Sequence, residues 1–212
     1  MIKIFIVDDH AIIREGLKRI ISKTKDIQIV GEATNSQEIF EQVLKSDWDV
    51  NIVLLDITLP GRSGLDVLKQ LKSLKPELKF LMLSIHPEDQ YALRALRSGA
   101  SGYMTKNSAP ELLTEAIRKI YMGGIYVSPS LAEKLASFVS KDSEGPLHES
   151  LSDREYQVMC MLASGKTVSE VARELVLSVK TISTNRHRLL IKMGMETNAQ
   201  LTYYAMQNKL ID

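Results

Sequence analysis

Four short apolar runs in the first half of the chain, each followed closely by a polar residue, constrain the fold more than any other feature. The runs cover residues 2–7, 50–55, 80–83 and 102–104. Apolar runs of this length, bounded by polar or turn residues, are typical of buried parallel strands. Amphipathic stretches of helical length separate the runs. This alternation predicts a doubly wound α/β unit, in which a parallel sheet carries helices on both faces.

The polar residues that follow the runs should meet at one edge of this sheet. Open parallel sheets bind ligands at the carboxyl ends of their strands, near the point where the strand order reverses. Three carboxylates, a hydroxyl and an ammonium group reach this edge, from Asp8, Asp9, Asp56, Ser84 and Lys106. Three converging carboxylates repel one another unless a cation joins them. Mg²⁺ suits carboxylate and phosphate oxygens, so the pattern predicts a magnesium site.

The residue types also indicate phosphoryl chemistry. A carboxylate beside Mg²⁺ can attack phosphorus and form an aspartyl phosphate. The ammonium group of Lys106 would neutralise charge on the phosphoryl group, and the Ser84 hydroxyl would hydrogen-bond its oxygens. Each residue alone has an ordinary interpretation, because an aspartate after a strand is most often a turn or capping residue and a lysine is most often solvated. The joint pattern at four successive strand ends favours the phosphorylation site.

The same residues and their neighbours resemble the receiver domain of two-component response regulators. The matching pieces are Asp8 and Asp9, the stretch Asp-Ile-Thr-Leu-Pro-Gly at 56–61, Ser84, and Gly-Tyr-Met-Thr-Lys at 102–106. They occur in the right order and spacing over roughly residues 1–122. The resemblance implies a flavodoxin-like five-stranded parallel sheet with strand order 2-1-3-4-5.

The resemblance also implies how the site works. Asp56 would accept a phosphoryl group from a sensor histidine kinase, and Lys106 would bind that group. Asp9, the Asp56 carboxylate and the Thr58 backbone carbonyl would ligate Mg²⁺. Asp8 would act on the ion largely through water. The receiver would dephosphorylate itself slowly, and no second catalytic domain is expected.

A switch pair would report the phosphorylated state. By the same resemblance, Ser84 would be drawn toward the phosphoryl group while Tyr103 repacks inward, which moves the face formed by the fourth helix and fifth strand. Pro87 restricts the backbone of His86 two residues beyond Ser84. We therefore expect the His86 imidazole to tune the lifetime of the phosphorylated state.

Length and composition fit two globular domains. At 212 residues the chain exceeds the usual prior of about 150 residues for one domain. The single cysteine, Cys160, excludes an intrachain disulfide and suits a reducing cytoplasm. No signal peptide or membrane span is expected, because the apolar runs are far shorter than the roughly 18 residues that a span needs. A linker at 123–149, with a short helix from Ser130 to about Val139, would join domains at 1–122 and 150–212.

The second domain reads as a run of short helices with explicit start and stop signals. Capping boxes at Ser152–Glu155 and Thr167–Glu170 start the first two, and Ser178 caps a third that ends at Gly194. A tight turn at 176–177 separates the second helix from the third. Two helices joined by such a turn predict a helix-turn-helix unit in a small all-α domain.

The third helix carries the predicted interface. Ile182, Leu189 and Met193 share one face, and the opposite face is basic and hydroxyl-bearing, with no acidic residue between Ser178 and Gly194. The ordinary interpretation is the solvated face of a helical bundle. After a tight turn, however, this pattern favours recognition of the DNA major groove. The predicted contacts, some placed by the resemblance described next, are Lys180, Thr181, Ser183, Thr184, His187, Arg188 and Lys192.

This half resembles the LuxR-type DNA-binding domain of NarL/FixJ-type response regulators. Matching pieces include Leu-Ser-Asp-Arg-Glu at 151–155, Ala-Ser-Gly at 163–165 and Lys-Met-Gly at 192–194. By position, the base-reading residues would be Ser183, Thr184 and His187. The resemblance implies a transcription regulator that binds duplex operator DNA, as a homodimer after phosphorylation or on DNA. Two alternatives are a phosphohydrolase of its own aspartyl phosphate and a receiver whose C-terminal helices bind protein or RNA.

Overall fold

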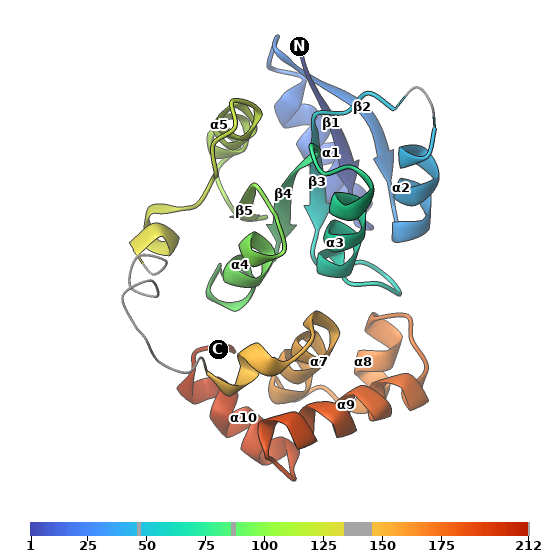
Figure 1. Ribbon diagram of the computed structural model, residues 1–212, viewed down its shortest axis with the longest axis vertical. Coiled ribbons are helices and arrows are strands. Elements are labelled where there is room, and N and C mark those ends of the chain that lie inside the picture. The colour runs from blue at the N-terminus through green and yellow to red at the C-terminus, as the bar shows by residue number, and fades with distance from the viewer. Residues whose placement is uncertain (46–47, 86–87, 134–145, 212) are drawn as a thin grey trace. The chain divides into compact units, whose positions relative to one another are not determined.

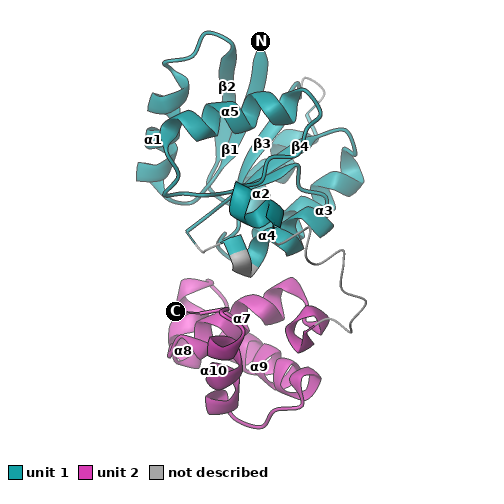
Figure 2. Ribbon diagram, turned by 90° about the vertical axis from the view of Figure 1, so that its left-hand side faces the viewer, with its two compact units in different colours: residues 1–136 teal, residues 137–212 magenta. Residues whose placement is uncertain are grey.

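The computed structural model describes residues 1–45, 48–85, 88–133 and 146–211. The chain divides into two compact units, Met1–Ala136 and Ser137–Asp212 (Figure 2). Each unit is described by itself below. Within the described residues, no helix combines the length and the apolar character needed to cross a membrane.

The first unit is built on the predicted parallel sheet. Its strands are β1 (Ile2–Val7), β2 (Ile27–Ala33), β3 (Ile52–Asp56), β4 (Lys79–Ser84) and β5 (Gly102–Thr105). They lie in the order β2-β1-β3-β4-β5, and every neighbouring pair is parallel. The order reverses between β1 and β3, whose carboxyl ends lie side by side (Figure 1). The predicted fold class and strand order are confirmed.

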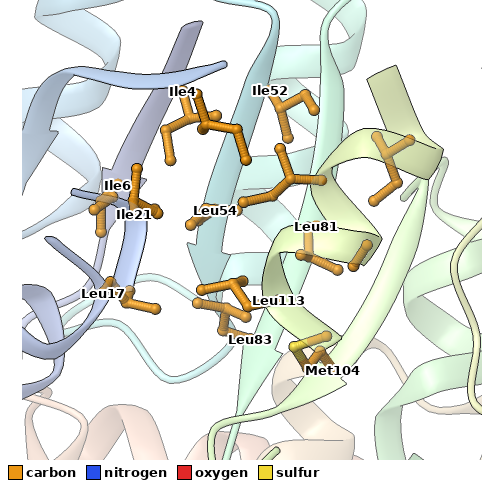
Figure 3. Packing of buried hydrophobic residues seen from close by; sticks show 14 of the residues in the cluster. Ile4, Ile6, Leu17, Ile21, Ile52, Leu54, Leu81, Leu83, Met104 and Leu113 are labelled. Atoms are coloured by element: carbon orange, nitrogen blue, oxygen red, sulfur yellow. The ribbon is translucent and has the colours of Figure 1, made fainter. Parts of the chain in front are cut away.

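Five helices cover the two faces of the sheet. They are α1 (Ala11–Ile21), α2 (Ser36–Val43), α3 (Gly64–Leu74), α4 (Glu88–Arg97) and α5 (Pro110–Tyr121). Alternate strand residues such as Ile4, Leu54 and Leu81 pack against Leu17 of α1 and Leu113 of α5 in one buried cluster (Figure 3). The helices α2, α3 and α4 cover the opposite face (Figure 1). Burial of both faces explains why the strands read as continuous apolar runs.

The chain after α5 returns along the outer edge of β5. The backbone N–H of Tyr103 donates to the Tyr126 carbonyl at 3.2 Å, and the Tyr126 N–H donates to the Ser101 carbonyl at 2.9 Å. The Ser128 hydroxyl then donates to the Glu88 carboxylate at the start of α4. These contacts protect an otherwise open strand edge. They also fasten the start of the linker beside β5 and α4.

The linker helix predicted from Ser130 to about Val139 is described only in part. Its helical residues begin at 129, the Ser128 hydroxyl accepts from the Leu131 N–H at 3.2 Å, and the described part ends at 133. The rest of that predicted helix, and most of the predicted linker after it, lie outside the described residues.

The second unit contains the predicted helices with their predicted caps. They are the 3₁₀ turn η1 (Leu147–Ser150), α7 (Asp153–Ala163), α8 (Val168–Glu174), α9 (Val179–Met193) and α10 (Asn198–Gln207). Both predicted capping boxes form, and the Ser178 side chain caps α9. Gly194 adopts the left-handed conformation, with φ 64°, that ends α9. Helices α8 and α9, joined by the short turn, form the helix-turn-helix pair.

Candidate phosphorylation site and DNA interface

The predicted polar residues converge at the carboxyl edge of the sheet. Asp8 follows β1, Asp56 ends β3 and Ser84 ends β4, and all three side chains are buried. Lys106 follows β5, and its backbone N–H donates to the Ser84 carbonyl at 2.7 Å. The parallel register therefore does what the sequence pattern predicted. It brings ends that are far apart along the chain into one site.

A buried lysine joins two of the carboxylates. Lys106 Nζ lies 2.7 Å from Asp56 Oδ2 and 2.7 Å from Asp8 Oδ2. The other oxygen of Asp56, Oδ1, accepts the Thr58 backbone N–H at 3.1 Å. Asp56 is therefore held by a cation on one oxygen and by a backbone donor on the other. This arrangement fixes the orientation of the carboxylate.

Burial dominates the electrostatics of Asp56. Desolvation, together with the nearby Asp8 carboxylate, raises the pKa of Asp56 to about 6, although Lys106 and the Thr58 N–H pull it down. The two carboxylates raise the pKa of Lys106 despite its own burial. At neutral pH the Asp56 carboxylate is thus mostly ionised, as a nucleophile must be, but its charge is poorly solvated.

Replacing the buried charge should stabilise the protein without metal. Because the pKa of Asp56 is higher in the folded protein than in the unfolded chain, this residue costs stability once pH rises above about 4. Asp56→Asn should therefore unfold at higher urea than wild type at pH 8, by on the order of 2 kcal/mol, with the difference vanishing near pH 4. Urea titrations in EDTA across this range measure it. A constant difference at all pH values would contradict the assignment.

A histidine that the sequence analysis did not include lies in the same cluster. His10 Nδ1 is 2.9 Å from Asp9 Oδ1, 3.2 Å from Asp8 Oδ1 and 3.9 Å from Asp56 Oδ2. Its backbone N–H also donates to Asp8 Oδ1 at 2.8 Å. One ligand atom from each of Asp8, Asp9, His10 and Asp56 lies within 4.8 Å of the others. The only sequence signal was a histidine directly after the aspartate pair.

The donor set fits a divalent cation. Asp8, Asp9 and Asp56 bring three carboxylates, whereas Lys106 supplies a single positive charge to two of them. The excess negative charge in a partly buried pocket is the condition that a hard cation relieves. Asp9 is the more solvent-accessible of the aspartate pair, so it can reach an ion directly, whereas Asp8 is buried against Lys106. The cluster is consistent with a metal site.

The switch residues lie inside the unit. Tyr103 is fully buried, and its hydroxyl shares a hydrogen bond with Ser84. Burial, opposed by that hydrogen bond, raises the pKa of the Tyr103 hydroxyl above its ordinary value. The predicted inward position of Tyr103 is therefore present in this structure. His86, which we expected to tune dephosphorylation, lies outside the described residues.

The predicted DNA-facing residues share the outer face of α9. Lys180, Thr181, Ser183, Thr184, His187, Arg188 and Lys192 are all exposed, whereas Ile182, Leu189 and Met193 are buried in the unit. The Thr184 hydroxyl donates to the Lys180 carbonyl at 3.0 Å, so it points along the helix. Val179 and Ile191 are exposed on this helix as well, at 51% and 66%.

One residue of this set has a partner within its own unit. Lys192 Nζ lies 2.6 Å from Glu155 Oε2, and Glu155 is buried and accepts the Ser152 N–H of its capping box at 2.9 Å. This ion pair, with the Ser152 hydrogen bonds, holds the pKa of Glu155 below its usual value against the opposing effect of burial. Lys192 therefore ties α9 to the start of α7, a role that sequence periodicity does not reveal.

Comparison with known proteins agrees with both halves of this description. Residues 4–118 match the family of response regulator receiver domains, and residues 149–205 match the bacterial regulatory proteins of the luxR family. The chain is 33% identical to response regulator GacA of Pseudomonas aeruginosa, with 100% of this chain and 99% of the relative covered. It is 32% identical to response regulator UvrY of Escherichia coli K12, covering 99% and 96%.

Solved structures show the same fold. RcsB from Salmonella enterica serovar Typhimurium, bound to a promoter with a phosphate mimic, superposes with a TM-score of 0.66 at 24% identity, over 97% of this chain and 99% of that one. A LuxR-family two-component response regulator from Aurantimonas has a TM-score of 0.60 at 33% identity, over 66% of this chain and 98% of that one. The predicted resemblance to both domain families is confirmed.

Proposed function

Because the chain belongs to the two-component response regulators that join a receiver to a LuxR-type DNA-binding domain, we propose that phosphorylation of Asp56 by a sensor histidine kinase controls binding of the α9 face to promoter DNA. The observation that carries the first half is the buried Asp56 held beside Lys106 and the Asp8–Asp9 pair. The second half rests on the exposed basic face of α9.

Phosphoryl transfer to Asp56 is an in-line displacement. A carboxylate oxygen of Asp56 forms a bond to phosphorus as the phosphorus–nitrogen bond of the kinase phosphohistidine breaks. Lys106 lies on the Oδ2 side and neutralises the added negative charge. Mg²⁺, held by Asp9, the Asp56 carboxylate and the Thr58 carbonyl, with Asp8 acting through water, would supply electrostatic stabilisation of the phosphoryl oxygens. The chain acts on no separate substrate, and only slow hydrolysis of its own aspartyl phosphate is proposed.

The switch would pass from the site to the linker. A phosphoryl group on Asp56 offers oxygens to the Ser84 hydroxyl, and Ser84 shares its hydrogen bond with Tyr103. The Tyr103 backbone in turn pairs with Tyr126 at the start of the linker. A shift at Ser84 therefore has a continuous hydrogen-bonded route to the segment that leads to the second unit. We propose that the phosphorylated chain acts in the cytoplasm as a homodimer on two operator half-sites.

The DNA half of the proposal predicts two kinds of variant. Lys180→Gln should weaken binding to all duplexes alike and flatten the log–log salt slope by roughly 0.9, because a phosphate contact releases one counterion. His187→Ala should instead cost about 1–3 kcal/mol at one base-pair position of the operator, because it loses a base contact. Fluorescence anisotropy on a duplex selected from a random pool, with beryllofluoride and Mg²⁺, measures both effects.

Controls separate this function from its alternatives. Lys209→Gln removes a comparable exposed lysine beyond the end of α10 and should leave the salt slope unchanged. Wild type should bind duplex DNA far more tightly than single strands or RNA of the same sequence. Equal affinity for RNA, or salt-independent binding, would instead support an RNA- or protein-binding output module.

A further inference from the structure

The inference concerns the ion that the acidic cluster takes, and it rests on the proposed function of that cluster. The proposed Mg²⁺ ligands are all oxygens, yet the structure adds an imidazole to them. His10 Nδ1 lies 2.9 Å from Asp9 Oδ1 and 3.9 Å from Asp56 Oδ2, so the nitrogen faces both carboxylates that would touch the ion. A residue outside the ion's reach would not approach oxygens from two different strand ends.

The two cationic or nitrogen-bearing side chains approach different oxygens. Lys106 contacts the Oδ2 atoms of Asp8 and Asp56, whereas the closest contacts of His10 are the Oδ1 atoms of Asp8 and Asp9. Lys106 is buried, but the His10 side chain is 56% exposed, so its ring can turn without breaking the core. The His10 backbone N–H donates to Asp8 Oδ1, a bond that any substitution except proline retains. The ring is therefore a movable ligand on a fixed loop.

Ligand chemistry then decides the selectivity. Mg²⁺ prefers oxygen ligands and keeps several waters, whereas first-row transition ions such as Co²⁺, Zn²⁺ and, more weakly, Mn²⁺ accept imidazole nitrogen readily. We propose that His10 is an additional ligand of the cluster that makes it favour imidazole-accepting divalent ions over Mg²⁺. The carboxylates provide affinity for both classes of ion. His10 supplies the part that differs between them.

The test measures binding of the metal ions themselves to the full chain. Calorimetric titrations with Co²⁺ and with Mg²⁺, at about pH 8 where free imidazole is neutral, give the ratio of the two affinities. His10→Ala should lower the Co²⁺ affinity by about tenfold and change the Mg²⁺ affinity by less than about twofold. His10→Asn keeps a polar side chain at this position but lacks the imidazole, and it should behave as His10→Ala does.

A spectroscopic signature shows ligation directly. The Co²⁺ complex of wild type should give a strongly shifted, exchangeable imidazole N–H proton resonance that His10→Asn lacks. The signature is needed because the chain has four histidines. Equal losses of Co²⁺ and Mg²⁺ affinity in His10→Ala, or a shifted resonance that survives in His10→Asn, would overturn the inference.

The outcome for the proposed site itself is read separately. Asp9→Asn and Asp56→Asn should each lose affinity for both ions, because both remove a carboxylate ligand. If wild type binds neither ion, or if both aspartate variants bind Mg²⁺ normally, the proposed metal site fails, and with it the inference. If the aspartate variants behave as expected but His10→Ala keeps the wild-type selectivity, only the role of His10 is wrong.

Discussion

Asp56→Asn is expected to abolish phosphorylation of this protein by acetyl phosphate and Mg²⁺. The variant keeps the shape of the side chain but lacks the anionic oxygen that must attack phosphorus. Asp56 is buried with one oxygen at 2.7 Å from Lys106, so no neighbouring carboxylate can take its place at the same distance without moving the strand end. Intact-protein mass spectrometry should show one added phosphoryl group on wild type and none on the variant.

Two further variants make this result specific. Asp26→Asn changes an exposed aspartate that pairs with Arg118, and it should be phosphorylated as wild type is. Lys106→Met should slow phosphorylation by about a hundredfold or more, because the buried Asp56 oxygen loses its cation. Phosphate incorporation into Asp56→Asn at the wild-type level would show that another residue is the acceptor.

The site could be predicted largely because parallel strands leave little freedom. Once 50–55 and 102–104 are recognised as strands of one sheet, Asp56 and Lys106 must lie at the same edge. The helix caps of the second unit were predictable for a similar reason, because a capping box needs only residues three positions apart. The outer face of α9 follows from the helical period alone.

Contacts between elements were harder to predict from the sequence. A lysine at position 192 looks like any other exposed basic residue, and only the folded unit shows that the buried Glu155 lies 2.6 Å away. Similarly, nothing in the sequence distinguishes His10 from a solvated loop residue. Its ring reaches the cluster because the loop after β1 turns back over Asp8. Both cases depend on the packing of distant segments rather than on local pattern.

Local signals can also compete, as the start of α5 shows. Ser108 and Glu111 have capping-box spacing around Pro110, but the structure places Ala109 at the N-cap without a side-chain hydrogen bond. The Ser108 hydroxyl instead pairs with Thr105 at 3.0 Å. Proline at the first helical position lacks an N–H, so the helix needs one cap fewer.

Gly64 is a further residue on which the site depends and whose role no motif reveals. It begins α3, and its N–H donates to the Ile57 carbonyl at 2.8 Å, which holds the helix against the loop that follows Asp56. A Cβ at this position would lie 2.0 Å from the Asp56 carbonyl oxygen and 2.9 Å from the Ile57 Cα. These are backbone atoms at the phosphorylation site, so no side-chain rotation can relieve the clash.

Gly64→Ala should therefore both destabilise the first unit and disturb phosphorylation. We expect a loss on the order of 3 kcal/mol in urea unfolding, since the added methyl group must push a helix away from a strand end. Gly16→Ala is the matched control, because a Cβ there meets nothing within 4 Å and sits inside α1. That control should gain about 0.5–1 kcal/mol from helix propensity alone. The acetyl phosphate reaction of Gly64→Ala, measured where the variant is still folded, should be slower than that of Gly16→Ala, because the displaced backbone carries Asp56. Equal stability of the two variants would mean that α3 does not approach the site as closely as the structure shows.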